Sequence, residues 1–130
     1  MSGVFWGGNL TLLCSLLGTP YFPYMDQGIL LIEDVNEHPY RIERMLLQLH
    51  YAGVLAKQKA VLFGDFSEYR LSDYDQGYDL SALLSYIRGV LPIPVVTNFP
   101  FGHIAYKRSL TLGLRARLSV SGHEACLYCA

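Results

Sequence analysis

Charged residues are scarce in this chain of 130 residues, where Asp, Glu, Lys and Arg make up only 16%. The ten Lys and Arg nearly balance the eleven Asp and Glu, which leaves a formal net charge of −1. A nucleic-acid binder normally carries an excess of basic residues on one face. The charge balance therefore excludes that class, and we expect no nucleic-acid partner.

Long hydrophobic runs are also lacking. None reaches the roughly 18 residues that a membrane-spanning helix needs, and the longest, 28–32 and 90–96, have the length of strands. The first residues lack the basic segment and the continuous apolar stretch of a signal peptide, because Trp6-Gly7-Gly8-Asn9 interrupts them. We therefore expect no membrane partner, and the small number of cysteines suits a reducing, cytoplasmic setting.

Cysteine is rare, because Cys14, Cys126 and Cys129 are too few for a disulfide framework. Cys126 and Cys129 have the spacing of a metal or redox pair, but a structural zinc site needs four ligands and the chain has no second pair. A three-ligand cluster that adds His123 stays open as an alternative. We prefer a C-terminal strand with two incidental thiols, and we expect neither a metal nor a cofactor.

Hydrophobic residues, in contrast, make up 52% of the chain, which is enough for a sizeable core. The length fits one domain, and no repeat or linker divides residues 1–130. With so few charges, either the core is large for its size or part of the apolar surface packs against something outside the chain.

The hydrophobic periodicity and the turn residues predict strand–helix alternation followed by a run of strands, which is typical of an α/β or α+β fold with a mixed sheet. We predict helices over 9–17, 39–52 and 80–90, and strands over 28–32, 60–64 and 92–97, with two or three more between 109 and 128. The segment 65–79 is predicted to be a solvated loop. Its likeness to a calcium loop is faint, since the closing Glu is missing.

Two ionisable groups stand at the ends of predicted strands. Glu33-Asp34 follows the strand over 28–32, and His103 lies in the loop after the strand over 92–97. Sites gather at the carboxyl ends of parallel strands, and a carboxylate that orients a His is half of a nucleophilic triad. The spacing alone makes the Glu33–His103 pair a weak hypothesis, because a strand-end acid is often a cap and a loop His is often a surface group. No serine stands in a Gly-x-Ser-x-Gly elbow, so a complete triad is missing.

An ordered series of short motifs runs from Trp6 to about His123. Its parts are GGNL (7–10), LGTP (17–20), IEDVNE (32–37), PYRIERML (39–46), QL (48–49) and FGH (101–103). Each motif is common alone, whereas the ordered set is specific. The series resembles the C-terminal half of the LD-carboxypeptidases, or muramoyltetrapeptide carboxypeptidases, a family that includes the microcin C immunity peptidases.

The resemblance implies an α/β domain of the swivelling β/β/α or twisted barrel-like type, with a mixed sheet and outer helices. It also implies a serine-type hydrolase with a Ser–His–Glu triad, which removes the terminal D-alanine from murein tetrapeptides during cytoplasmic recycling of peptidoglycan. Glu33 then corresponds to the triad carboxylate and His103 to the general base. Asp34 competes with Glu33, but the side chains of a strand alternate between its faces, so only one of the two acids can face His103. The motif favours Glu33.

In that family the nucleophilic serine lies in an N-terminal domain, and nothing in this chain corresponds to it. The resemblance therefore implies a chain that is inactive alone, with the N-terminal domain, the murein tetrapeptide and a second copy in a homodimer as partners. A non-catalytic dimerisation or docking module is the alternative.

Trp6-Gly7-Gly8-Asn9 is expected near the domain junction and the substrate cleft. Glycine permits close backbone approach there, and Trp6 could cover a ligand. A packing turn explains this segment equally well. If the apolar surplus faces a partner, apolar surface should be exposed around the Trp6 and His103 ends.

Overall fold

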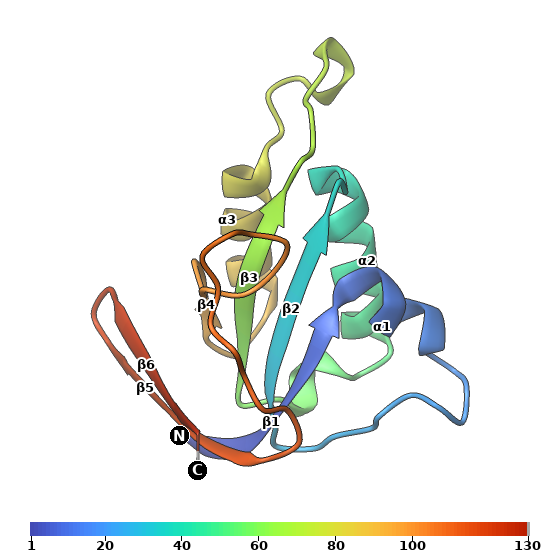
Figure 1. Cartoon of the computed structure of the whole chain (residues 1–130). Helices are drawn as coiled ribbons and strands as arrows, with labels where there is room; N and C mark the ends of the chain where they lie inside the picture. The colour runs from blue at the N-terminus through green and yellow to red at the C-terminus, as the bar shows by residue number, and fades with distance from the viewer. Residues whose placement is uncertain (130) are drawn as a thin grey trace.

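The computed structural model describes residues 1–129, which form one mixed sheet with helices outside it (Figure 1). The sheet has six strands in the order β4-β3-β2-β1-β5-β6. The strands are β1 Ser2–Asn9, β2 Ile29–Val35, β3 Ala60–Ser67, β4 Val95–Val96, β5 Arg115–Ser121 and β6 Glu124–Cys129. The helices are α1 Leu10–Leu16, α2 Pro39–Tyr51 and α3 Leu80–Val90, with short 3-10 turns at Leu55–Lys57 and Asp73–Asp75. This architecture confirms the predicted α/β class, with a twisted, barrel-like mixed sheet and outer helices.

The three predicted helices are confirmed, with ends within a residue or two of the expected positions. Asn9 caps α1, since its side-chain oxygen accepts a hydrogen bond from the backbone N–H of Leu12 at 3.0 Å. Pro39 begins α2 at the first helical position, where its missing N–H costs nothing. Asp79 caps α3 through the N–H of Ala82.

The strand β1 is not predicted by the sequence analysis, although it lies in the middle of the sheet. It pairs in parallel with β2 and antiparallel with β5. Its glycines and its single tryptophan resemble a turn more than a β-prone run, which explains the omission. The predicted strand over 92–97 is wrong in extent, because only β4 (Val95–Val96) pairs with β3 and the preceding prolines cannot donate to a ladder.

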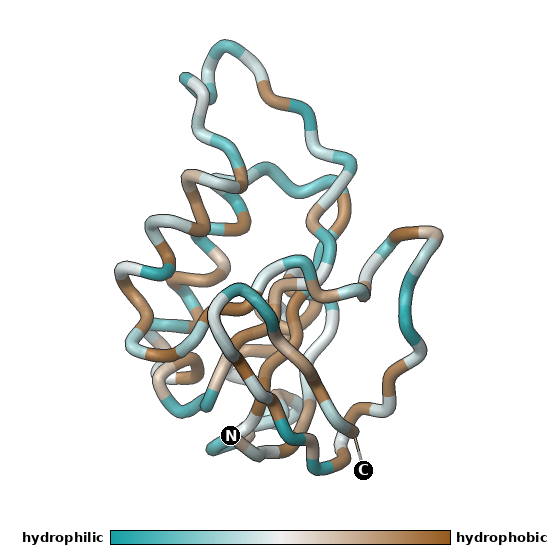
Figure 2. The backbone as a smooth tube through the Cα atoms, turned by 90° about the vertical axis from the view of Figure 1, so that its left-hand side faces the viewer, coloured by the Kyte–Doolittle hydropathy of each residue, from teal (hydrophilic) through white to brown (hydrophobic). Residues whose placement is uncertain are grey.

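Strand alternation divides the core into two halves, one on each face of the sheet. The even-numbered residues of β2, Leu30 and Ile32, pack with the three helices. The odd-numbered Ile29 and Leu31 pack on the other face with β5 and with the long connection from β4 to β5. Figure 1 shows that connection crossing in front of the sheet, and in Figure 2 it lies on the opposite side of the apolar strands from the helices. The strands are therefore covered on both faces.

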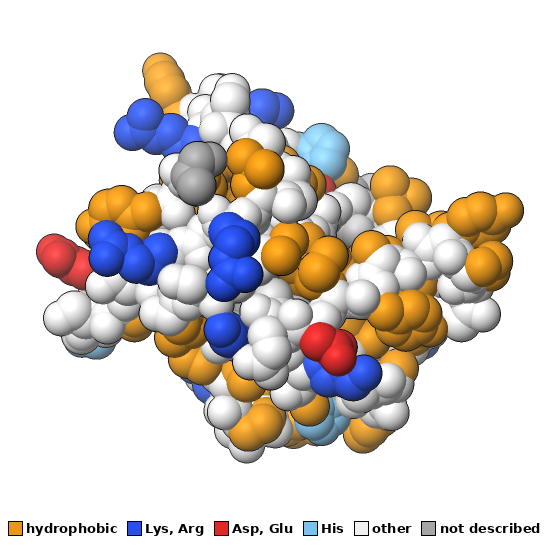
Figure 3. All heavy atoms as spheres, turned by 90° about the horizontal axis from the view of Figure 1, so that it is seen from below, with side chains coloured by type: hydrophobic (Ala, Val, Ile, Leu, Met, Phe, Trp, Pro, Cys, Tyr) orange, Lys and Arg blue, Asp and Glu red, His pale blue; other side chains and the backbone are white. Residues whose placement is uncertain are grey.

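Aromatic side chains are exposed near both expected sites. Tyr21 and Tyr24 are 79% and 64% exposed beside the buried Phe22, whose ring packs edge-on against that of Trp6. Tyr106, three residues after His103, is 94% exposed. These exposed tyrosines show that the surface near Trp6 and near His103 is not evenly polar. The face at the amino ends of the parallel strands, seen from below, also carries several groups of hydrophobic side chains between Lys and Arg side chains (Figure 3).

Gly7 allows β1 to approach β2. Its φ is +115°, a conformation that other residues rarely adopt, and a Cβ atom on Gly7 would lie 2.0 Å from the carbonyl oxygen of Leu31. The backbone of β2 would have to move to admit it, which requires breaking the pairing of two central strands.

We therefore expect Gly7→Ala to lower the free energy of unfolding by about 3 kcal/mol or more, because strain and overpacking add. Gly89→Ala is the matched control, since Gly89 lies in α3 with open space around it. It should stabilise the chain by about 0.5–1 kcal/mol through helix propensity. Urea unfolding of both variants measures this, and equal effects would contradict the packing argument.

Candidate active site

Glu33 and His103, 70 residues apart in the sequence, meet at the carboxyl end of β2. His103 Nδ1 lies 2.9 Å from Glu33 Oε2. Glu33 follows Ile29 and Leu31 on the face that the β4–β5 connection covers, and that connection carries His103. The structure thus brings together the two residues that the sequence analysis pairs.

The two members of the pair differ strongly in burial. The side chain of Glu33 is 6% exposed, whereas that of His103 is 56% exposed. When Glu33 is ionised, its carboxylate can only accept, so Nδ1 of His103 then donates in this contact, and Nε2 of the neutral ring is left as an acceptor. Within residues 1–129 His103 makes no other side-chain hydrogen bond. Such a ring is oriented from its buried side and open on the other, which is the geometry of a general base.

Two backbone contacts hold the loop that carries His103. The N–H of Phe99 donates to the carbonyl of Phe63 at 3.0 Å, and the N–H of Asp65 donates to the carbonyl of Phe101 at 2.7 Å. The loop therefore continues along β3 after β4 has ended. This extension brings His103 over the end of β2.

Glycine makes the necessary space. A Cβ atom on Gly64 would lie 2.6 Å from the carbonyl oxygen of Phe101 and 3.2 Å from Cβ of Glu33. Ile32 pairs with Phe63 but Asp34 pairs with Phe66, so β3 has one residue more than β2 at this point. This β-bulge lies beside the Glu33–His103 pair, as bulges often do at sites.

Asp65 is a polar residue of the site that the sequence analysis misses. The prediction that residues 65–79 form a solvated loop is wrong at its start, because β3 continues to Ser67. Gly102 packs against Asp65, since a Cβ on Gly102 would lie 2.9 Å from Cβ of Asp65. The Oδ2 atom of Asp65 is buried and has no hydrogen-bond partner among the described residues. No pattern in the sequence signals this position.

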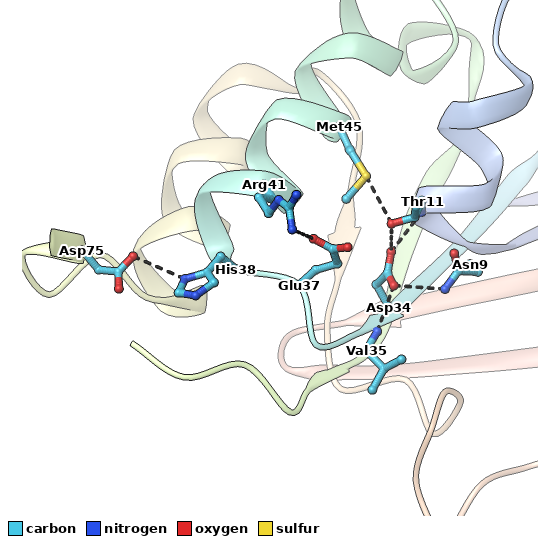
Figure 4. A network of polar contacts seen from close by, with 9 residues as sticks. All are labelled: Asn9, Thr11, Asp34, Val35, Glu37, His38, Arg41, Met45 and Asp75. Atoms are coloured by element: carbon cyan, nitrogen blue, oxygen red, sulfur yellow. Dashed lines mark hydrogen bonds and ion pairs between the residues drawn. The ribbon is translucent and has the colours of Figure 1, made fainter. Parts of the chain in front are cut away.

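Asp34 joins the end of β2 to Asn9 and to Thr11 at the start of α1 (Figure 4). Its carboxylate accepts hydrogen bonds from Asn9 Nδ2 at 3.1 Å, from the N–H and the hydroxyl of Thr11 at 2.9 and 2.7 Å, and from the N–H of Val35 at 2.9 Å. All these donors lie where β1 enters α1 or where β2 ends. Asp34 therefore stabilises the strand end that carries Glu33.

The segment Trp6-Gly7-Gly8-Asn9 is the second half of β1. Trp6 is 4% exposed, and its indole N–H donates to Gln58 at 2.9 Å, so its placement favours the packing alternative. Gly8 has nothing within 4 Å of its Cβ position. Asn9 pairs in register with Glu33, and its side chain is occupied by the α1 cap and by Asp34. The substrate-binding role of this segment stays a prediction.

The three cysteines differ in burial. Burial raises the pKa of Cys14 to about 11, and the charge of Asp34 adds to the rise. Cys126 and Cys129 are exposed. Over residues 1–129 no three His, Cys, Asp or Glu side chains converge as metal ligands, so the cluster of His123 with these two cysteines does not form. Nor is any described helix long and apolar enough to span a bilayer.

A histidine in contact with a buried carboxylate thus lies at the carboxyl end of the parallel strands β2 and β3, and the comparisons with known proteins give the family of the chain. The family profile of the LD-carboxypeptidase C-terminal domain matches residues 2–118. The chain therefore belongs to the LD-carboxypeptidase family and corresponds to its C-terminal domain.

Solved and curated relatives agree with this assignment. A crystal structure of muramoyltetrapeptide carboxypeptidase from Oxalobacter formigenes has a TM-score of 0.94 and 54% identity, covering 98% of this chain and 45% of that one. The murein tetrapeptide carboxypeptidase of Pseudomonas aeruginosa is 30% identical over 119 residues, which are 91% of this chain and 38% of that protein.

The microcin C7 self-immunity protein MccF shares the fold at lower identity. An active-site mutant of MccF, with a serine, an asparagine and a lysine replaced by alanine, has a TM-score of 0.76 and 25% identity over 89% of this chain and 34% of that one. The chain spans little more than a third of the length of the curated relatives first matched, 37% in one and 36% in another.

The Asp34 contacts predict a large effect on stability. We expect Asp34→Ala to lower the free energy of unfolding by about 2–4 kcal/mol, because four donors lose their acceptor. The control is Asp26→Ala, whose ion pair with Lys57 at 3.4 Å is exposed, and it should change the stability by at most about 0.5 kcal/mol. Denaturant unfolding separates the two. Similar losses in both variants would refute the role given to Asp34.

The rate of cysteine alkylation tests the burial and the raised pKa of Cys14 in α1. With a pKa of about 11, only about 0.1% of the Cys14 thiol is ionised at pH 8, and burial blocks the reagent as well. We expect iodoacetamide at pH 8 to alkylate Cys126 and Cys129 at least tenfold faster than Cys14, as followed by peptide mass spectrometry. Unfolding in urea is the control, and it should equalise the three rates.

Proposed function

We propose that this chain supplies the general base and its orienting carboxylate to a serine-type LD-carboxypeptidase that removes the terminal D-alanine from murein tetrapeptides. The observation that carries the proposal is the 2.9 Å contact between His103 Nδ1 and Glu33 Oε2, in which the carboxylate is buried and the ring is open. This is the arrangement that the base of a nucleophilic triad requires.

The proposed reaction uses Nε2 of His103. A serine hydroxyl from the part of the enzyme outside this chain attacks the scissile carbonyl and gives its proton to Nε2. The imidazolium then protonates the nitrogen of the leaving D-alanine as the peptide bond breaks and the acyl-enzyme forms. Water, deprotonated by the same nitrogen, hydrolyses the acyl-enzyme and restores the serine. Glu33 keeps Nδ1 protonated and stabilises the imidazolium in both steps.

Several similarities support this proposal. The Oxalobacter formigenes protein is named a muramoyltetrapeptide carboxypeptidase, and the Pseudomonas aeruginosa protein is named a murein tetrapeptide carboxypeptidase. A serine is among the active-site residues replaced in MccF. Because this chain covers 45% of the Oxalobacter formigenes enzyme, the remainder of such an enzyme has room for a nucleophile-bearing domain.

The same proposal includes the setting of the reaction. It gives the enzyme a role in cytoplasmic recycling of peptidoglycan. Within one copy of the complete protein, the serine-bearing domain is the partner of this domain, and two copies form a homodimer. This chain alone then lacks the nucleophile and should be inactive.

The test combines this chain with the serine-bearing domain and measures D-alanine release from a murein tetrapeptide. We expect no measurable release by this chain alone, and activity with the added domain. His103→Ala should then lower kcat about 1000-fold or more, and Glu33→Gln about 100- to 10,000-fold, because the base or its tautomer is lost.

His123→Ala is the matched control, because His123 is an exposed histidine in the β5–β6 turn, and it should keep full activity. Far-UV circular dichroism confirms that each variant folds. Activity restored equally by the His103→Ala chain would leave the non-catalytic docking module as the function. Robust turnover by this chain alone would overturn the assignment of the nucleophile.

A further inference from the structure

A hollow on α2 lies at the carboxyl edge of the sheet, outside the Glu33–His103 pair. Its volume is about 380 Å³. It is lined by Thr11, Glu37, Arg41, Arg44, Met45 and Gln48. Arg41, Arg44 and Gln48 of α2 are spaced by three and four positions, so they share one face of the helix. From the sequence, this face of the helix is expected to be a solvated or interface surface.

The hollow contains two guanidinium groups and one carboxylate. Arg41 Nη1 lies 3.6 Å from Glu37 Oε2, and the two side chains are 54% and 21% exposed. Arg44 lies over the ring of Tyr40, 5.5 Å from its centroid, and forms no ion pair with any residue of 1–129. The hollow therefore has a net positive charge, and most of its ten guanidinium N–H donors are without an acidic acceptor.

The position of the hollow connects it to the catalytic pair. Thr11 lines the hollow, and both its N–H and its hydroxyl donate to Asp34, the residue that follows Glu33. Figure 4 shows Arg41 and Glu37 at the start of α2, beside Met45, Thr11 and Asp34. The same strand end thus carries the orienting carboxylate on one face and borders the hollow on the other.

We propose that Arg41 and Arg44 form a subsite that binds a carboxylate group of the peptide substrate. The inference rests on the proposed function, because a carboxypeptidase acts on a chain with a free terminal carboxylate, and an acidic peptide offers side-chain carboxylates as well. A planar guanidinium matches a carboxylate with two parallel N–H bonds. Arg44 is held over Tyr40 before the ligand arrives, which lowers the entropy cost of binding. Arg41 has a single contact with Glu37, at 3.6 Å, so its other N–H groups remain for a second acceptor.

A binding experiment on this chain tests the subsite directly. The ¹⁵N-labelled chain is titrated with N-acetyl-D-alanine, and with N-acetyl-D-alaninamide as the neutral probe. We expect the carboxylate to shift the Nε–H signals of Arg41 and Arg44 with a dissociation constant of about 1–10 mM, typical of a small ligand held by one ion-pair site. The amide should bind at least tenfold more weakly.

Variants assign the shifts to the proposed residues. Arg44→Gln alone, and Arg41→Gln with Arg44→Gln, should each weaken carboxylate binding about tenfold or more. The control is Arg117→Gln, because Arg117 also stacks on a tyrosine, at 4.7 Å from the ring of Tyr128, but lies on β5 outside the hollow. Equal binding of acid and amide, unchanged binding by the variants, or no shift below about 50 mM of the acid would overturn the proposal.

Kinetics of the enzyme assembled with its serine-bearing domain then identify the source of the carboxylate. Arg44→Gln should raise KM about tenfold and leave kcat within about threefold, since the contact is made equally in the ground state and the transition state. If the KM effect persists on a tetrapeptide whose side-chain carboxylates are amidated, the terminal carboxylate is bound, and if it disappears, a side-chain carboxylate is bound. An inactive assembly would refute the proposed function, while the titration still decides the subsite.

Discussion

The site depends on the period-two alternation of β2. Two acids follow each other at the end of this buried strand, and the alternation sends Glu33 to the face of His103 and Asp34 to the face of the helices. Asp34 is held by donors from β1, α1 and its own strand. A slip of β2 by one residue would put Asp34 against His103 and leave those donors without an acceptor. The hydrogen bonds to Asp34 that stabilise the end of β2 therefore also determine that Glu33, and not Asp34, contacts His103.

The absence of a side chain at two glycines is as important for the position of His103 as the hydrogen bonds are. Gly64 leaves room for both Glu33 and the backbone of Phe101, and Gly102 leaves room for Asp65. With a Cβ at either position, the loop that carries His103 would lie further from β3. Its hydrogen bond to the N–H of Asp65, at 2.7 Å, would then be lost. The 2.9 Å contact of the pair thus follows from how closely two backbones can approach.

The sequence predicts what depends on local pattern. Helix caps and hydrophobic periodicity are local, so α2 and α3 are placed nearly to the residue. The central strand β1 is missed because the Gly7-Gly8 pair satisfies a non-local constraint, the approach to β2, that in the sequence resembles a turn. Their places after predicted strands make the pairing of Glu33 with His103 only a weak hypothesis, and the resemblance to a family makes it specific, since no local rule joins residues that far apart. Asp65 is missed because a bulge leaves no mark in the sequence.

Under the proposed function, the unequal burial of Glu33 and His103 explains how one domain can carry half of an active site. A carboxylate that is 6% exposed is desolvated, so its interaction with the ring is stronger than it would be at the surface. The ring itself is 56% exposed, and its open edge is free to meet a hydroxyl from elsewhere. Orientation is therefore fixed within this fold, before any nucleophile or substrate arrives. Under the proposed function, docking of the serine-bearing domain completes a base whose tautomer and direction are already set, and that docking need not reorganise the sheet.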